Sequence, residues 1–224
     1  MSVLYLTGSS GGLGKAIRAF YLEKGWKVVG FDAFDDKFIA DGYSSYLIDS
    51  TDEASVQKAF SAATASKGAP DQLIATIGGL KPWATADELS ISDFRFIIDL
   101  NLVSTFISVK QALQSMKQCG SGSIVTIGAD TALHSEPRKS AYIAAKAAVI
   151  AFTQAIAEET KEFGVTANVI LPKVIHTKAN EEWGSPEEIP RWTEPSDIAS
   201  FCFYLASPEG KAINGAMIRI PNKA

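Results

Sequence analysis

The sequence predicts an α/β fold in one domain: a doubly wound, mostly parallel sheet of seven strands with helices on both faces. Short apolar segments alternate with longer helical patterns along the 224 residues, which is the order of successive βαβ units. The short segments are nearly continuous apolar runs, as expected when helices cover both faces of a sheet. A glycine-rich turn joins the first strand to the first helix, where such sheets bind nucleotides.

The expected elements alternate regularly along the chain. Strands are expected at residues 2–6, 27–31, 45–48, 72–77, 123–127, 166–171 and 216–220. Helices are expected at residues 13–24, 54–66, 92–116, 141–163 and 197–206, and the third is long enough to divide into two. Gly25, Gly120, Gly122 and Gly164 stand where helices should end, because glycine readily adopts the left-handed conformation found there. Ser196-Asp197, after a proline, should cap the last helix.

The one long connection covers residues 176–194 and contains two prolines and two tryptophans. Long loops in compact domains are usually lids or binding loops. We therefore predict a single nucleotide-binding domain over residues 1–224, with a substrate loop around residues 176–194.

Composition argues against several classes of partner. The 21 basic and 25 acidic residues give a net charge of -4, so nucleic acid is not expected. Apolar runs stop far short of the roughly 20 residues that span a bilayer, so no membrane span is expected. No positive patch precedes the apolar stretch at residues 1–5, so no signal peptide is expected. Cys119 and Cys202 form no disulfide framework. We expect a cytoplasmic protein.

No metal site is expected either. His134 and His176 are far apart in the sequence and lack cysteine or acidic partners at the spacing of metal ligands.

The turn after the first strand reads Thr7-Gly8-Ser9-Ser10-Gly11-Gly12-Leu13-Gly14. Glycines let the backbone approach a pyrophosphate, and the following helix offers free N–H groups and its positive dipole end. Cofactor-binding residues here are Gly8, Ser10, Gly12 and Leu13. The same letters match the GxSxG turn of serine hydrolases, but no earlier strand and loop exist to supply an oxyanion hole.

An acid ends the second strand. Asp32 stands about 20 residues past the glycines, where a carboxylate accepts both ribose hydroxyls and repels a 2′-phosphate. NAD(H) is therefore favoured over NADP(H), although a carboxylate that merely caps a turn is the alternative. Asp49, after the third expected strand, should lie near the adenine. Ile77 and Gly78, after the fourth expected strand, should line the cofactor. At each of these two positions a simple turn is the alternative interpretation.

Tyr142 and Lys146 stand four residues apart on a predicted helix, so they share one face. A free phenol titrates near ~10. A nearby ammonium favours the phenolate and should lower the tyrosine pKa towards neutral pH. Tyr142 is thus the expected proton donor to a substrate that receives hydride.

Together these motifs resemble the short-chain dehydrogenase/reductase family over essentially the whole chain, which implies a Rossmann-type sheet. The resemblance implies that Lys146 also bonds the nicotinamide ribose and that Asn101 holds a water chain leading to this lysine. The segment from Asn168 to Thr177 is similar to the one that flanks nicotinamide in the family. By this resemblance the further cofactor-binding residues are Pro172, Ile175 and Thr177.

One departure from the family is informative. The catalytic serine thirteen residues before the tyrosine is here Ala129. Dihydropteridine reductases, which use NADH, keep the Tyr–Lys pair without this serine. The chain is similar to them in Gly128–Leu133 and in the run from Leu171 to Thr193. We therefore expect hydride transfer between NAD(H) and a small substrate with a C=N or C=O bond.

Two alternatives stay open. A carbonyl or 3-oxoacyl reductase would use Thr131 in place of the missing serine, and a catalytically weak NAD-binding sensor or scaffold would need no serine at all. Candidate substrate contacts are Thr131, His134, Trp83 and Trp183, which fall in loops near the expected carboxyl ends of the strands. In related proteins the helices equivalent to 101–116 and 141–163 pair between subunits, which implies a homodimer or homotetramer.

Overall fold

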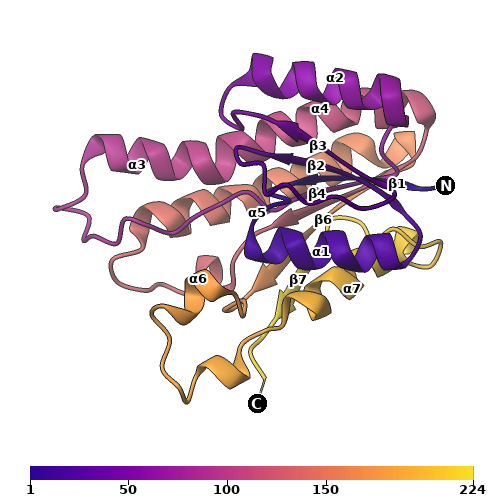
Figure 1. The fold of residues 1–224 in the computed structure, drawn as a ribbon. Coiled ribbons are helices and arrows are strands. Elements are labelled where there is room, and N and C mark those ends of the chain that lie inside the picture. Colours follow the sequence, from indigo (N-terminus) through magenta and orange to yellow (C-terminus); the bar gives the residue numbers. More distant parts are fainter. Residues whose placement is uncertain (224) are drawn as a thin grey trace.

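A computed structural model describes residues 1–223 of the chain. Seven parallel strands form one sheet in the order β3-β2-β1-β4-β5-β6-β7 (Figure 1). The strands are β1 (Val3–Thr7), β2 (Lys27–Asp32), β3 (Tyr43–Leu47), β4 (Gln72–Ala75), β5 (Gly122–Ile127), β6 (Val165–Pro172) and β7 (Met217–Ile220). All seven predicted strands are confirmed within two residues. The order confirms a Rossmann-type, doubly wound sheet, here fully parallel.

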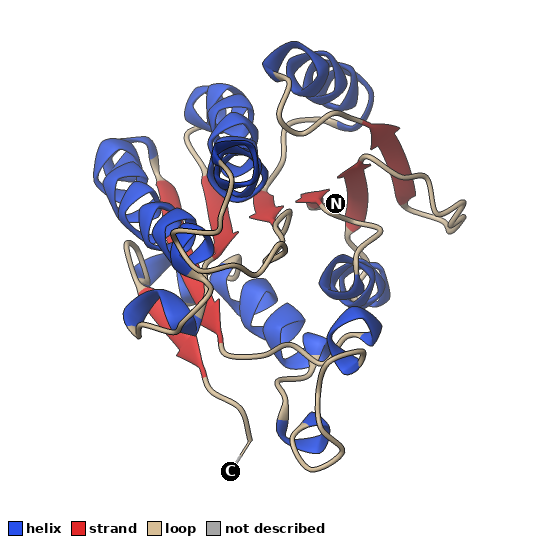
Figure 2. Cartoon of the chain, turned by 90° about the vertical axis from the view of Figure 1, so that its left-hand side faces the viewer, coloured by secondary structure: helices blue, strands red, loops and turns tan. Residues whose placement is uncertain are grey.

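Helices cover both faces of the sheet (Figures 1 and 2). They are α1 (Gly12–Glu23), α2 (Glu53–Lys67), α3 (Ile91–Ile98), α4 (Ser104–Cys119), α5 (Ser140–Thr160), the short α6 (Lys178–Glu181) and α7 (Pro195–Leu205). One core cluster joins the sheet to α2, α4 and α5. A second joins the opposite face to α1 and α7. This two-sided burial explains why the strands read as continuous apolar runs.

Three details differ from the prediction. The stretch expected to divide into two helices is continuous, because a π-helical turn at Asp99–Val103 joins α3 to α4. The N-cap of α7 is Glu194 rather than Ser196-Asp197, because Pro195 already occupies the first helical turn, where its missing N–H has no cost. Gly122 lies inside β5, whereas Gly120 and Gly164 end helical segments in the left-handed conformation as predicted.

Parallel strands bring their carboxyl ends to one edge of the sheet. The strand order reverses between β1 and β4, which lie side by side in the centre. Ligands of open α/β sheets bind at this reversal. It brings together the glycine-rich turn after β1, Asp32 at the end of β2 and the chain after β4.

Two helical runs, Ile91–Cys119 and Ser140–Phe163, are apolar and long enough to cross a membrane by length and composition alone. About half of each apolar window is buried in the fold, 50% and 44% respectively. Helices that cover a sheet meet the same criterion, and α5 packs directly on β6. The expectation of no membrane partner stays a prediction.

Candidate active site

A cleft of about 550 Å³ opens at the carboxyl ends of β1, β2 and β4. The residues that line it are Gly8, Ser10, Gly11, Gly12, Leu13, Gly14, Lys15, Asp32, Phe34, Asp36, Thr76, Ile77, Gly78 and Leu100. Seven of the predicted cofactor-binding residues are therefore brought together in one wall: Gly8, Ser10, Gly12, Leu13, Asp32, Ile77 and Gly78.

The glycine-rich turn has the shape of an anion cradle. Gly8 has a φ of 73°, which favours glycine, and a Cβ at Gly12 would lie 2.7 Å from Cγ2 of Thr177. Gly11 caps α1 without any side-chain hydrogen bond, so the first N–H groups of this helix keep no side-chain acceptor. These N–H groups and the helix dipole favour a phosphate at this end. The cleft therefore fits the pyrophosphate of a dinucleotide.

Asp32 shapes the neighbouring part of the cleft. Its carboxylate accepts a hydrogen bond from the backbone N–H of Ser10 at 2.8 Å, which ties the end of β2 to the glycine-rich turn. The carboxylate also faces the cleft, where it can accept hydrogen bonds from ribose hydroxyls.

Two cations lie near this end of the cleft, which the sequence had not indicated. The buried Arg18 makes a two-armed ion pair with Asp36, with its nitrogens 3.0 and 3.2 Å from the carboxylate oxygens. Lys15 lies 3.9 Å from the same carboxylate. The Arg18 guanidinium lowers the pKa of Asp36. Asp36 thus engages the positive charges that a 2′-phosphate would need.

Asn101, Gly78 and Lys146 meet behind the cleft. The π-helical turn carries Asn101, whose fully buried amide donates to the carbonyls of Gly79 at 2.8 Å and Ile97 at 2.9 Å. A Cβ at Gly78 would lie 2.7 Å from Asn101 Oδ1 and 3.0 Å from Lys146 Nζ. Only glycine leaves room for both polar groups, so the wall of the cleft and Lys146 are in direct contact.

Lys146 is buried on α5, and its Nζ donates to the carbonyl of Ile127 at 2.8 Å. Burial lowers the pKa of Lys146 from 10.5 to about 8. The carbonyl at the end of β5 is a partner that no sequence motif predicted. It holds the ammonium at the carboxyl edge of the sheet.

The prediction that Lys146 lowers the pKa of Tyr142 is wrong. Burial raises the pKa of Tyr142 to about 12, and the Glu136 carboxylate adds to this rise. The Lys146 ammonium lies 5.8 Å from the centre of the tyrosine ring and donates its hydrogen bond to the carbonyl of Ile127. Tyr142 is therefore a neutral phenol at neutral pH, the form that can donate a proton.

Ala129 lies buried at the end of β5, so no hydroxyl is present at this position. The Thr131 hydroxyl, two residues further, is buried and makes no hydrogen bond of ordinary geometry among residues 1–223, and it lies near enough to Glu136 to help lower the pKa of that carboxyl. A buried hydroxyl without such a bond is available to a ligand.

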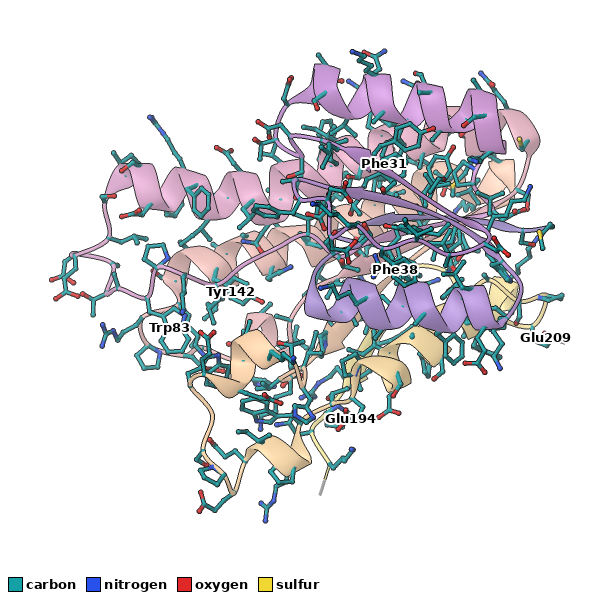
Figure 3. The ribbon with its side chains drawn as sticks, in the orientation of Figure 1. Phe31, Phe38, Trp83, Tyr142, Glu194 and Glu209 are labelled. Carbon is teal, nitrogen blue, oxygen red and sulfur yellow. The ribbon has the colours of Figure 1, made fainter. Side chains whose placement is uncertain are left out.

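Trp83 and Trp183 come from two loops and meet in an edge-to-face pair with ring centres 5.8 Å apart. Trp183 also packs on the buried Trp192 at 5.1 Å. Residues around Trp83 line a crevice together with Tyr142, and Figure 3 shows both labelled side chains at the end of the molecule beyond the carboxyl ends of the strands. The tryptophans thus form an aromatic wall (Trp83, Trp183 and Trp192) on the tyrosine side of the cleft.

The remaining predicted residues lie outside the wall of the cleft. The Asp49 carboxylate accepts from the N–H and hydroxyl of its own neighbour Thr51, as in a simple turn. Pro172 ends β6, and Ile175 makes a bridge to Thr193. Thr177, although not lining the cleft, packs against Gly12 as described above.

The two histidines have partners that the sequence did not reveal. His134 is exposed, with Nε2 at 3.3 Å from Arg219. His176 lies between Glu181 and Glu194. Within residues 1–223 no group of three or more histidine, cysteine or acidic side chains is arranged to hold a metal ion.

Comparison with known proteins gives a consistent match. The family model described as short chain dehydrogenase matches residues 2–188. D-threitol dehydrogenase of Mycolicibacterium smegmatis is 31% identical, over 96% of this chain and 89% of the relative. The 3-oxoacyl-(acyl-carrier-protein) reductase FabG of Vibrio cholerae is 30% identical, over 97% of this chain and 95% of the relative. The solved structure described as ElxO with NADP bound has a TM-score of 0.91 and 25% identity, over 98% of this chain and 97% of that chain.

Proposed function

The chain belongs to the short-chain dehydrogenase family of oxidoreductases, and we propose that it is an NAD(H)-dependent reductase of a small substrate with a C=N or C=O bond, similar to dihydropteridine reductase. The observation that carries the proposal is the contact at Gly78. This residue lines the dinucleotide cleft and also touches Asn101 and Lys146. This contact sets Lys146 against the wall of the cleft, and Tyr142 stands one helical turn before Lys146 on α5.

The cofactor fits the residues present. Gly8, Gly12 and the N-terminus of α1 would hold its pyrophosphate, Asp32 its adenosine ribose and Lys146 its nicotinamide ribose. Ile77, which lines the cleft, would contact the nicotinamide half. By the family resemblance, Pro172, Ile175 and Thr177, which lie outside the wall of the cleft, would flank the same half, and Asp49 would lie near the adenine. When bound, the nicotinamide supplies or accepts the hydride.

Preference for NAD(H) over NADP(H) rests on the acids at the adenosine end. ElxO, which shares the fold, carries NADP, so the fold alone does not decide the preference. In this chain Asp32 faces the cleft, and Asp36 pairs with Arg18 and Lys15. A 2′-phosphate would therefore meet the Asp32 carboxylate, while the nearest cations, Arg18 and Lys15, already face Asp36.

Tyr142 is the proton donor in this mechanism. Its phenol is neutral at neutral pH because its pKa is raised, so its hydroxyl donates a proton to the substrate nitrogen or oxygen as hydride arrives on the adjacent carbon. The tyrosinate that is left regains its proton from solvent. Lys146 would hold the nicotinamide ribose, and Asn101 anchors the chain next to Lys146. In the reverse direction the tyrosinate accepts the proton.

Two features support a flat, electron-poor ring as the substrate. Ala129 offers no hydroxyl to polarise a ketone, whereas a quinonoid ring needs less help to accept hydride. The aromatic wall offers Trp83 and Trp183 as faces or edges for a flat heterocycle. His134, exposed in the loop before α5, is a further candidate contact.

The test measures NADH oxidation by absorbance with three substrate classes in parallel: a quinonoid dihydropterin, ketones and 3-oxoacyl thioesters. Each substrate is then assayed again with NADPH in place of NADH. We expect turnover of the dihydropterin with NADH. Turnover of the carbonyl substrates alone would refute the pterin substrate, and NADPH as the better cofactor would refute the cofactor preference. NADH binding without any turnover would support a sensor or scaffold instead.

A second candidate is a 3-oxoacyl reductase. The Vibrio cholerae relative with that name aligns over nearly the whole chain, and the buried Thr131 hydroxyl makes no hydrogen bond of ordinary geometry among the residues described. It could then bond the substrate carbonyl in place of the missing serine. This candidate predicts that Thr131→Ala abolishes reduction of 3-oxoacyl thioesters.

We also propose a homodimer or homotetramer in the cytoplasm. Phe94, Phe96 and Phe106 are exposed along α3 and α4, and exposed apolar patches commonly mark interfaces between proteins. Light scattering coupled to size-exclusion chromatography tests this assembly, because a monomer at micromolar concentration would refute it.

A further inference from the structure

His176 stands at the start of the substrate loop between two carboxylates. Its Nε2 lies 2.7 Å from Glu181 Oε1, and its Nδ1 lies 3.1 Å from Glu194 Oε1. Glu181 is the last residue of α6, and Glu194 directly precedes α7. The imidazole thus connects both ends of the loop, in the region where Figure 3 labels Glu194.

The geometry fixes the protonation state that suits this bridge. An ionised carboxylate only accepts hydrogen bonds, and a neutral imidazole carries one N–H. Both contacts are hydrogen bonds only when His176 is an imidazolium with two N–H groups. Loss of one proton turns one of the two contacts into a repulsion between lone pairs.

The bridge is linked to the cofactor cleft through the next residue. Thr177 caps α6 by accepting from the N–H of Asn180 at 3.3 Å. Its methyl group packs on Gly12, the first residue of α1. The backbone N–H of His176 donates to the carbonyl of Thr193 at 2.9 Å. A shift of α6 therefore moves Thr177 relative to the phosphate-binding turn.

We propose that His176 is a positioning residue: as an imidazolium that bridges Glu181 and Glu194, it holds Thr177 against the phosphate-binding turn, so that NADH binds more weakly once His176 loses its proton. This inference rests on the proposed function, because it assumes that the cleft binds NADH.

The charged groups around His176 agree with this role. Glu181 comes from α6, Glu194 from the residue before α7, and Lys223 from the C-terminal segment, where its Nζ lies 3.3 Å from Glu194. Trp192, which packs near the imidazole ring, has no charge. Glu194 and Glu181 raise the pKa of His176 above 6.5. The bridge is therefore complete below pH 6.5 and is lost as pH rises through the raised pKa.

The first experiment measures the dissociation constant of NADH by fluorescence between pH 6 and 9, for the wild type, His176→Gln and His176→Arg. We expect the affinity of the wild type for NADH to fall about three- to fivefold over this pH range because the bridge is lost. The His176→Gln variant should bind weakly at pH 6 and lack this part of the slope. The permanently charged His176→Arg variant should keep tight binding to higher pH. Lys146 also titrates in this pH range, but it does so in all three proteins, so its effect on the affinity for NADH cancels when the proteins are compared.

A matched pair of glutamates provides the control. Glu181→Gln should reduce the affinity for NADH at pH 6. Glu182 is an exposed neighbour whose side chain makes no hydrogen bond or ion pair within residues 1–223, so Glu182→Gln should bind NADH as the wild type does. Equal effects of both changes would overturn the proposal, because they would point to charge alone. The same pH slope in the wild type and His176→Gln would overturn it as well.

A readout independent of the cofactor is available because the chain has only two histidines. Nuclear magnetic resonance of the ring protons should give a titration midpoint for His176 above 6.5 that falls in Glu181→Gln. An unperturbed His176 would refute the bridge, even if NADH binds. If NADH does not bind at any pH while His176 still titrates as expected, the proposed function fails and the bridge itself stands.

Discussion

Replacement of the buried Lys146 by methionine should increase stability and abolish activity. Burial lowers the pKa of Lys146 from 10.5 to about 8, which means that the folded state binds its proton less tightly than the unfolded state does. Below pH 8 the folded protein therefore carries the full cost of a buried ammonium. A shift of this size corresponds to about 3 kcal/mol at pH 7 and about 1 kcal/mol at pH 10.

The variant also loses a hydrogen bond. Without the ammonium, the carbonyl of Ile127 has no donor from residue 146, which costs about 1 kcal/mol at any pH. The expected net gain in the free energy of unfolding for Lys146→Met is thus about 2 kcal/mol at pH 7 and close to zero at pH 10. For a domain of this size, the gain at pH 7 raises the melting temperature by about 4–8 °C.

Urea unfolding of the wild type and Lys146→Met at pH 7 and pH 10 checks these values. The exposed Lys161, paired only with Glu158, gives a control, since Lys161→Met should change the stability by less than about 0.5 kcal/mol at both pH values. A Lys146→Met variant that is less stable than the wild type at pH 7, or whose gain does not shrink at pH 10, would refute the reasoning. NADH oxidation by Lys146→Met should fall at least about 100-fold.

Two further substitutions test the cleft. Asp32→Ala should weaken NADH binding by about 100-fold or more, because two charged hydrogen bonds to ribose are lost, and should improve NADPH binding. Unchanged dissociation constants for both cofactors, measured by fluorescence titration, would exclude this role. Gly78→Ala places a methyl group 2.7 Å from Asn101 Oδ1 and 3.0 Å from Lys146 Nζ, so we expect a loss of about 1–3 kcal/mol in stability and about tenfold in kcat/KM. Gly79→Ala, whose methyl group meets only the flexible end of Leu100, should cost less in both measurements, and equal losses would contradict the account.

The fold could be predicted from the sequence because its signals are local. Apolar runs and the spacing of helical residues identified every strand and long helix within two or three residues of its observed ends. The continuity of α3 and α4 was missed, because the π-helical turn between them depends on contacts of Asn101 with Ile97 and the distant Gly79. No pattern within the helix itself reveals such a contact.

The sequence predicted which residues of the candidate site lie together better than it predicted their chemistry. Seven of the predicted cofactor-binding residues line one cleft, because parallel strands end at one edge of the sheet. The pKa of Tyr142 shifts in the opposite direction to the prediction, because burial of the phenol and the Glu136 carboxylate both raise it. The acidic partners of His176 lie five and eighteen residues further along the chain. They were missed because their approach depends on how the substrate loop folds back.

The most direct test of the account is a comparison of NADH binding and NADH oxidation in the wild type and Tyr142→Phe. Removal of one hydroxyl leaves the phosphate-binding turn, Asp32 and Lys146 in place, so the dissociation constant of NADH should stay within about twofold of the wild type. The rate of NADH oxidation with a quinonoid dihydropterin should fall about 10²- to 10⁴-fold, because the proton donor is lost. A Tyr142→Phe protein that oxidises NADH as fast as the wild type would contradict the assignment of Tyr142 as the proton donor.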